Sequence, residues 1–283
     1  MTLGEPSRTA MAAAAHRAAH QILEEGRIFT DPLAIRILGL DAAGIALDAK
    51  AHPSRRGMRL FIAVRTRYTE DELAAAAERG VRQLVVLGAG LDTYAYRGTL
   101  RDRLRIFEVD HPATQAWKRE RLAGAGIPLP ASLTFAPVDF ERETLADGLA
   151  AAGFDPAKPA FFTWLGVVPY LTEPAVWSTL GFIAGLRSQA HVVFDYGDPP
   201  DRLSPEMRAR HDRRAARVAA LGEKWLIWFD PQCLRAKLMA TGFTEVDDIG
   251  PPEIRARYFP DAPFPAPTKG GHVLHATSPG RAK

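Results

Sequence analysis

The sequence has one cysteine, Cys233, among its 283 residues. A single cysteine excludes a disulfide bond within the chain and fits a reducing compartment, so we expect a cytoplasmic protein. No apolar run approaches the length of about 18 residues that a membrane-spanning helix needs. The N-terminus also lacks the basic region and long apolar core of a signal peptide. We therefore expect neither secretion nor a membrane partner.

The motifs of several enzyme classes are missing as well. There is no H-E-x-x-H, no paired cysteine for a metal, no Walker A lysine and no G-x-S-x-G. His16 and His20 would share one helix face, which suits either a metal pair or two residues on a helix surface. Because no third ligand lies near them in sequence, we favour the helix surface and expect no metal. The net charge of +3 is small, so we expect no nucleic-acid partner, which would need a clustered basic face.

The stretch QLVVLGAGLDT, residues 83–93, is the most informative part of the chain. Its four apolar residues are typical of a strand buried on both faces, as in a parallel sheet. Gly88 and Gly90 follow directly, and glycine lets the backbone turn tightly and approach a ligand closely. Ligands bind beyond the carboxyl ends of strands in open α/β sheets, so we expect this turn to form the floor of a binding site.

Apolar strand segments alternate with helical segments along the chain. The expected strands are 83–87, 104–110, 133–138, 159–168 and 190–196, followed by a late pair at 245–249 and 271–277. Helices of ten or more residues between strands predict an α/β fold with a parallel sheet and right-handed crossovers. The late pair should lie antiparallel at one edge. Pro137 cannot donate to a ladder, so the third strand should be an edge strand or end there. Residues 48–57 are expected to form a loop.

Acids follow the second and third strands. Asp110 lies 20 residues after Gly90, a spacing that suits hydrogen bonds to ribose hydroxyls. The alternative is that Asp110 caps the helix that opens at Pro112. Asp139, followed by Phe140, ends the third strand in the same way. Acids at these places predict a ligand that contains adenosine.

The glycine turn helps to choose between NAD and S-adenosylmethionine. A dinucleotide needs G-x-G-x-x-G, but Thr93 stands at the third glycine position. Asp92 would repel a pyrophosphate and suits instead the positive amino end of a methionine. The pattern therefore favours S-adenosylmethionine, with a Rossmann-type NAD-dependent oxidoreductase or a cofactor-binding protein without catalysis as alternatives.

Basic segments lie on both sides of this core. Arg65 and Arg67 precede the first strand and could clamp an anionic group, although a solvated helix face is the simpler interpretation. The basic helix RARHDRRAAR, residues 208–217, is interpreted as a solvated lid, under which His211 could face a substrate. The aromatic residues at 225–229 could belong to the core or form a site wall.

At this point the chain resembles the leucine carboxyl methyltransferase family, in its bacterial branch of S-adenosylmethionine-dependent enzymes. The matching stretches are RTRYTEDEL, QLVVLGAGLDTYAYR, FEVDHP, FAPVDF and FFTWLGVVPYL, with weaker matches at GRIFTDPLAIRIL and WFDPQCLRAKLMATGF. The combination of GAGLDT with EVDHP is far more specific than either motif alone. The resemblance implies a Rossmann-like class I methyltransferase fold, with a mostly parallel seven-stranded sheet whose last strand is antiparallel, and a helical N-terminal cap.

The resemblance also implies roles for individual residues. Arg65 would hold the cofactor carboxylate, with Arg67 as the alternative. Gly88 and Gly90 would lie under the methionine part of the cofactor, and Asp110 would bind its ribose. Asp139 and Phe140 would contact the adenine. The family often places a glutamate before the YL segment, whereas this chain has Trp164-Leu165-Gly166 there. An apolar acceptor pocket is therefore expected.

We expect one domain over the whole chain. Its parts are a helical N-terminal cap at 1–60, a cofactor-binding core at 80–200, a lid helix at 201–230 and the C-terminal part of the sheet at 231–283. The expected reaction is O-methylation of a small molecule, with protein carboxyl methylation as the alternative. A carboxylate acceptor needs no base because it is ionised at neutral pH, whereas a phenol would need one. Tyr170, Tyr196 and His211 are the candidates.

Overall fold

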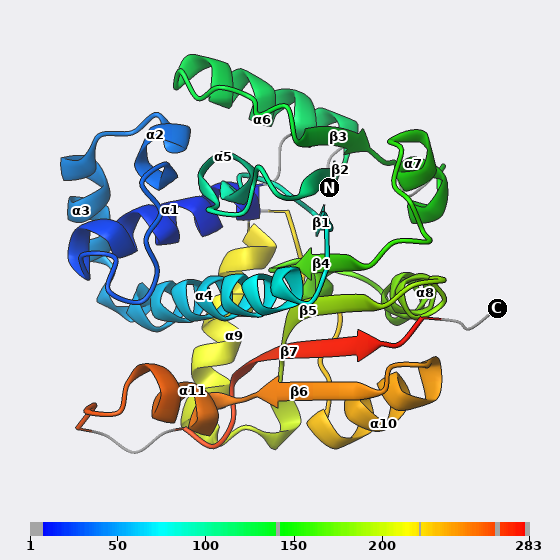
Figure 1. The fold of residues 1–283 in the computed structure, drawn as a ribbon. Helices are drawn as coiled ribbons and strands as arrows, with labels where there is room; N and C mark the ends of the chain where they lie inside the picture. The colour runs from blue at the N-terminus through cyan, green and yellow to red at the C-terminus, as the bar shows by residue number, and fades with distance from the viewer. Residues whose placement is uncertain (1–7, 140–141, 221, 264–266, 281–283) are drawn as a thin grey trace.

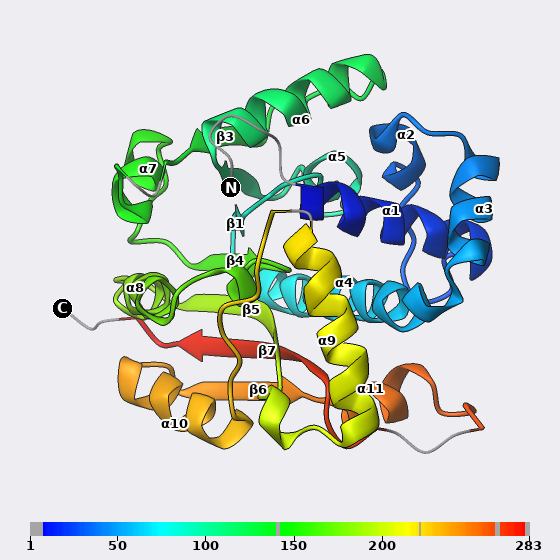
Figure 2. The same cartoon turned by 180° about the vertical axis from the view of Figure 1, so that it is seen from behind.

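A seven-stranded mixed sheet lies between two layers of helices (Figures 1 and 2). The computed structural model describes residues 8–139, 142–220, 222–263 and 267–280. The strands are β1 Gln83–Leu87, β2 Arg105–Asp110, β3 Leu133–Pro137, β4 Ala160–Trp164, β5 Ala190–Gly197, β6 Glu245–Ile249 and β7 Gly271–Ser278. Their order is β3-β2-β1-β4-β5-β7-β6, and β7 runs antiparallel to both of its neighbours. The expected sheet with an antiparallel last strand is confirmed.

The strand order reverses between β1 and β4. From β1 the chain first proceeds outward to β2 and β3, and then returns to place β4 on the other side of β1. Such a reversal leaves a crevice at the carboxyl ends of the two central strands, where ligands bind in open α/β sheets. β3 is an edge strand with Pro137 as its last residue, as the missing N–H predicts.

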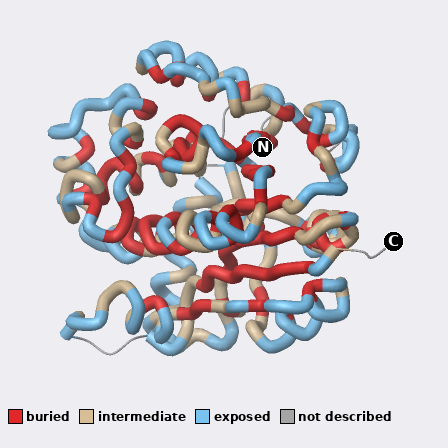
Figure 3. Tube along the Cα trace, viewed as in Figure 1, coloured by how far each residue is buried: buried red, intermediate tan, exposed pale blue. Residues whose placement is uncertain are grey.

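Helices cover both faces of the sheet because the side chains of each central strand alternate between two cores. Leu84 and Val86 of β1 pack on the face covered by the N-terminal helices, whereas Val85 and Leu87 pack on the opposite face. The helices that follow β1 in the chain are α5 Tyr94–Arg97, α6 Pro112–Gly124, α7 Leu145–Ala151, α8 Glu173–Ala184, α9 Pro205–Ala220, α10 Pro231–Thr241 and α11 Pro251–Tyr258. The tube in Figure 3 shows the burial concentrated in the strands and in the inward sides of the helices.

The N-terminal helices are α1 Arg8–Leu23, α2 Ala34–Leu38, α3 Ala42–Ala51 and α4 Arg56–Glu78. The loop expected at 48–57 is wrong, because α3 continues to Ala51, a 3₁₀ turn spans Pro53–Arg55 and α4 begins at Arg56. Pro53 and Ser54 suggested a loop, but proline is tolerated in the first turn of a helix because its missing N–H would have no intrahelical partner.

In Figure 2 the helix α9 lies in front of α4 and runs towards the amino end of α1. At its carboxyl end the chain contacts α1, since the Thr9 hydroxyl donates to a carboxylate oxygen of Glu223 at 2.7 Å. These contacts place the helices α1, α4 and α9 around the crevice. None of the helices in the described ranges is long and apolar enough to cross a membrane.

Candidate functional site

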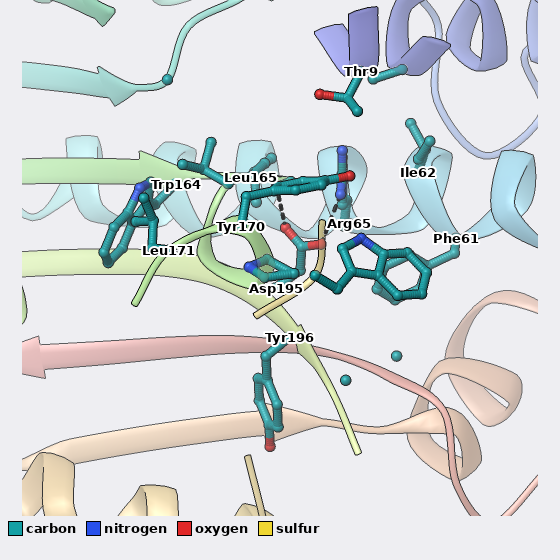
Figure 4. Close-up of a pocket in the computed structure, with 18 of the residues that line it drawn as sticks. Thr9, Phe61, Ile62, Arg65, Trp164, Leu165, Tyr170, Leu171, Asp195 and Tyr196 are labelled. Atoms are coloured by element: carbon teal, nitrogen blue, oxygen red, sulfur yellow. Dashed lines mark hydrogen bonds and ion pairs between the residues drawn. The ribbon is translucent and has the colours of Figure 1, made fainter. Parts of the chain in front are cut away.

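A cavity of about 1740 Å³ lies at the carboxyl ends of the central strands, bordered by α1, α4 and α9. Pockets for a single drug-sized ligand usually measure about 300–1,000 Å³, so this volume can hold two molecules side by side. Figure 4 shows part of the lining, with Arg65 and Asp195 joined at its centre. The cavity is therefore the candidate site for a cofactor and a second substrate.

The glycine turn lies against the cavity with little room for side chains. Gly88 and Gly90 have φ angles of 65° and 42°, a region that favours glycine. A Cβ on Gly88 would lie 2.4 Å from Cγ2 of Val167, and one on Gly90 would lie 2.9 Å from Cβ of Ala10. These contacts are with protein atoms, so the role of the two glycines in bringing the backbone close to a ligand stays a prediction.

Asp110 stands at the end of β2 and lines the same cavity. One of its carboxylate oxygens accepts the Gly90 N–H at 2.7 Å and the other accepts the His111 N–H at 2.7 Å. The cap of α6 is His111, whose Nδ1 accepts the Ala113 N–H at 3.2 Å. The alternative of Asp110 as the helix cap is therefore wrong. Burial raises the pKa of the Asp110 carboxyl, opposed by the backbone hydrogen bonds from Gly90 and His111.

Asp92 and Asp139 also line the cavity. Asp92 accepts the Tyr94 N–H at 2.8 Å, so part of its hydrogen-bonding capacity serves the turn into α5. The backbone carbonyl of Asp139 accepts the N–H groups of Arg142 and Glu143, which turns the chain after β3. Phe140, the adenine-site candidate beside it, lies outside the described residues.

Arg65 and Arg67 are separated by the structure. Arg65 lines the cavity, and its Nη1 lies 2.7 Å from Oδ2 of Asp195, while its buried Nε has no hydrogen-bond partner in the part of the chain that the structure describes. Arg67 is exposed on the other side of α4 and pairs with Asp71 at 2.9 Å. Only the first of these arginines is placed to hold an anionic group in the cavity.

Asp195 also lines the cavity, although it was not among the site residues predicted from the sequence. Besides Arg65 it accepts the Gly166 N–H at 2.5 Å, which ties the end of β5 to the segment after β4. Gly166 has a φ of 71°, and a Cβ there would lie 2.8 Å from Nη2 of Arg65. Asp195 thus brings a carboxylate to the Trp164-Leu165-Gly166 segment, which has none of its own. The available signal was an acid after the apolar run of the fifth strand.

The two candidate tyrosines differ in where their hydroxyl groups lie. Tyr170 is half-buried beside Asp195 and Arg65, and burial raises its pKa (Figure 4). Tyr196 points away from this pair, and its hydroxyl donates to Asp248. Burial, followed by the negative charge of Asp248, raises the pKa of Tyr196 well above its ordinary value. Tyr196 is therefore a poor base at neutral pH.

His211 lies on the inward side of α9 and lines the cavity. Its ring lies close to both Trp225 and Trp228, with centroid distances of 5.4 and 5.7 Å. Nδ1 lies 3.0 Å from a carboxylate oxygen of Asp212, and the buried Nε2 has no hydrogen-bond partner within the described ranges. If Nδ1 carries the proton, Nε2 is a free acceptor. The interpretation of this helix as merely a solvated lid is incomplete, because one of its faces lines the site.

The expectation that His16 and His20 lie on a helix surface is wrong. His20 is fully buried and its Nδ1 lies 3.2 Å from Glu24, whereas His16 lines the cavity. Burial, with a smaller contribution from nearby arginines, lowers the pKa of His16 to about 4. Within the described ranges, no group of three His, Cys, Asp or Glu residues could hold a metal ion.

The family model of leucine carboxyl methyltransferase matches residues 10–184. A Mycobacterium avium protein assigned to the S-adenosyl-L-methionine-dependent methyltransferases is 34% identical over 270 residues, covering 87% of this chain and 78% of that protein. YktD of Bacillus subtilis, assigned to the same class, is 33% identical over 197 residues, covering 69% of this chain and 64% of YktD.

Solved structures agree in fold. A Thermobifida fusca protein assigned as a methyltransferase superposes with a TM-score of 0.58 at 16% identity, covering 98% of this chain and 96% of that one. A DUF574 family protein of Streptomyces avermitilis gives a TM-score of 0.53 at 15% identity, with 94% and 97% covered. The family match and the sequence relatives together show that the chain belongs to the leucine carboxyl methyltransferase family and is an S-adenosyl-L-methionine-dependent methyltransferase.

Proposed function

We propose that this enzyme methylates an oxygen atom of a small molecule. The observation that carries the proposal is the continuity of the cavity, which extends from the glycine turn and Asp110 to the aromatic wall at Trp225 and Trp228. The cofactor would occupy the first part and the acceptor the second. The α9 helix borders the cavity, and Glu223, which follows α9, contacts Thr9 of α1; this covering favours an acceptor that fits inside over a protein chain end.

The cavity residues fit S-adenosylmethionine. Gly88 has no Cβ to obstruct the turn, and Arg65 keeps a buried Nε that lacks a partner. The proposed ligands are Arg65 for the carboxylate, Asp92 for the amino group, Gly88 and Gly90 for the methionine chain, Asp110 for the ribose, and Asp139 with Phe140 for the adenine. A guanidinium suits a carboxylate because it donates two parallel hydrogen bonds.

The protein contributes orientation and exclusion of water. When bound, S-adenosylmethionine supplies an electrophilic methyl group on a sulfonium. Arg65 would orient the cofactor, and the apolar wall would keep water from the reacting atoms. For a hydroxyl acceptor, we propose that Nε2 of His211 takes the proton, because His211 lines the cavity and this nitrogen has no hydrogen-bond partner among the described residues. A carboxylate acceptor would not need this step.

Two measurements test the proposal. Calorimetry should detect binding of S-adenosylhomocysteine and none of NAD; tight NAD binding would favour the oxidoreductase alternative. Methyl transfer from radiolabelled S-adenosylmethionine should then be compared between a set of phenols and aromatic acids and a peptide that ends in leucine. Transfer to the peptide alone would replace the small-molecule proposal with protein carboxyl methylation.

His211 has its own test. The variant His211→Gln should lower turnover of a phenol at pH 7 by roughly 10²–10⁴-fold, the usual contribution of a general base. Binding of S-adenosylhomocysteine should stay unchanged, and the loss should shrink at high pH, where the phenol ionises without help. A loss that is the same at every pH would assign His211 to acceptor binding only.

A further inference from the structure

The inward face of α9 carries a charge that the proposed reaction does not use. Met207, His211 and Arg214 are spaced by four and three residues, so they share one face of the helix, and all three line the cavity. Arg213 lies on the exposed side. The α9 helix lies across α4, in front of it in Figure 2, and Arg214 lines the cavity from this helix.

Arg214 lacks a carboxylate partner among the described residues. Four arginines help to lower the pKa of His16 through their positive charge. Three of them form an ion pair with a carboxylate: Arg55 with Asp48, Arg59 with Glu24 and Arg65 with Asp195. The fourth is Arg214, and the charged groups that act on it are Arg217 and Arg210, both basic. Arg214 therefore brings to the cavity wall a positive charge that no described acid balances.

This charge lies apart from the proposed cofactor carboxylate site. A Cβ on Gly57 would lie 3.5 Å from Nη2 of Arg214, which places the guanidinium beside the start of α4. Arg65 follows Gly57 by eight residues on the same helix, and at 1.5 Å per residue this is roughly 12 Å along the axis. Arg65 already pairs with Asp195, whereas no described acid pairs with Arg214, so we assign Arg214 to a group on the acceptor.

We propose that Arg214 binds a carboxylate of the acceptor that is not itself methylated. This inference rests on the proposed function and names the class of substrate. A half-buried arginine without a described acid partner favours a carboxylate, which accepts two parallel hydrogen bonds from the guanidinium. Trp225, Trp228 and Phe61 border the same space and suit a flat apolar body. The acceptor is therefore an aromatic carboxylic acid that is anchored at one end and methylated on an oxygen at the other.

The test uses 4-hydroxycinnamate and its uncharged amide as probes. Calorimetry on the full chain saturated with S-adenosylhomocysteine should show the acid binding at least tenfold more tightly than the amide. Arg214→Gln should remove this preference, Arg214→Lys should keep part of it, and Arg213→Gln, on the exposed side of the same helix, should leave it unchanged. Binding of S-adenosylhomocysteine should be equal in all four proteins.

The outcomes separate the anchor from the proposed function. If the wild-type protein binds S-adenosylhomocysteine but shows no preference for the acid, or if Arg214→Gln keeps the preference, the anchor is wrong and the cofactor assignment stands. If the wild-type protein does not bind S-adenosylhomocysteine, the proposed function fails and the anchor fails with it.

Discussion

The Asp110 carboxylate accepts hydrogen bonds from two backbone N–H groups. This arrangement determines how a substitution of Asp110 would change ligand binding and stability. Both oxygens already accept a hydrogen bond, one from Gly90 and one from His111. A carboxylate oxygen has two acceptor sites, so each can still accept from a ribose hydroxyl. Asparagine would turn an NH₂ group towards one of these N–H donors.

For Asp110→Asn we therefore expect losses in both binding and stability. A charge-assisted hydrogen bond contributes about 1.5–3 kcal/mol, so the dissociation constant of S-adenosylhomocysteine should rise roughly ten- to a hundredfold. The unpaired N–H should lower the free energy of unfolding by about 1–3 kcal/mol. Calorimetry with S-adenosylhomocysteine and with its 2′-deoxy analogue checks the ribose role. If the variant discriminates between these two ligands as well as the wild type does, Asp110 does not contact the 2′ hydroxyl.

Arg65 offers a comparison with its neighbour on α4. We expect Arg65→Lys to weaken S-adenosylhomocysteine binding about tenfold or more, because lysine cannot donate two parallel hydrogen bonds to a carboxylate. Arg67→Lys is the matched control, since Arg67 is exposed and pairs with Asp71. Titration calorimetry should show a change in the first variant only. Equal effects in both variants would count against a clamp at Arg65.

At the scale of elements, the β1 strand and its glycine turn depend on a segment that lies far away in sequence. Val167 follows β4 and fills the space where a Gly88 side chain would lie, so the turn and this segment must fit together. The α9 helix likewise borders the cavity only because it lies across α4. The strand–turn unit defines the floor of the site, and the packing of neighbouring segments defines its walls.

A double substitution separates steric conflict from backbone strain at the turn. Gly88→Ala combines a Cβ placed 2.4 Å from Val167 Cγ2 with a positive φ, and we expect it to cost about 2–4 kcal/mol of stability. Val167→Ala in the same chain should recover about 1–2 kcal/mol, because only the steric part is relieved. Urea unfolding measures both. Gly124→Ala, where a Cβ meets nothing within 4 Å, should be neutral or slightly stabilising. Strictly additive effects of the two substitutions would argue against the contact.

At the scale of the whole molecule, a buried histidine pair links the β5–β7 ladder to α4. Nδ1 of His191 lies 3.1 Å from Nε2 of His275, and Nδ1 of His275 lies 3.1 Å from Glu72. Burial, followed by the charges of His275 and Arg79, lowers the pKa of His191 to about 4, while Glu72 opposes the shift. The unfolded chain therefore binds more protons at this position between the ordinary pKa and the depressed one.

This difference makes stability depend on pH with a definite sign. At pH 7 the His191 ring is neutral in both the folded and the unfolded state. As the pH falls from about 6.5 to about 4, the unfolded state gains the proton first, so the free energy of unfolding falls by up to about 3 kcal/mol. Below that range both states are protonated and the contribution ends. Urea unfolding at pH 7 and pH 5 should show a smaller loss in His191→Asn than in the wild type. An NMR titration of His191 near pH 6.5 would contradict the prediction.

The sequence by itself determined the features that are written locally. Short-range periodicity and backbone chemistry predicted the alternation of strands and helices, the glycine turn, the acids at the ends of β2 and β3, and the edge position of the strand that ends at Pro137. The structure agrees with the predicted fold. Even the family could be inferred, because its motifs are contiguous stretches. The start of α4 was missed since Pro53 suits a loop and a first helical turn equally well.

Tertiary structure decided which side chains meet. Arg65 and Asp195 lie 130 residues apart, and they pair only because the sheet places β5 beside α4. His20 is buried and Arg214 faces the cavity for the same reason: a helix pattern fixes which residues share a face, but not which face another element covers. Charge partners and acceptor contacts depend on that covering, because burial and distance set electrostatic energies, and both are properties of the folded chain.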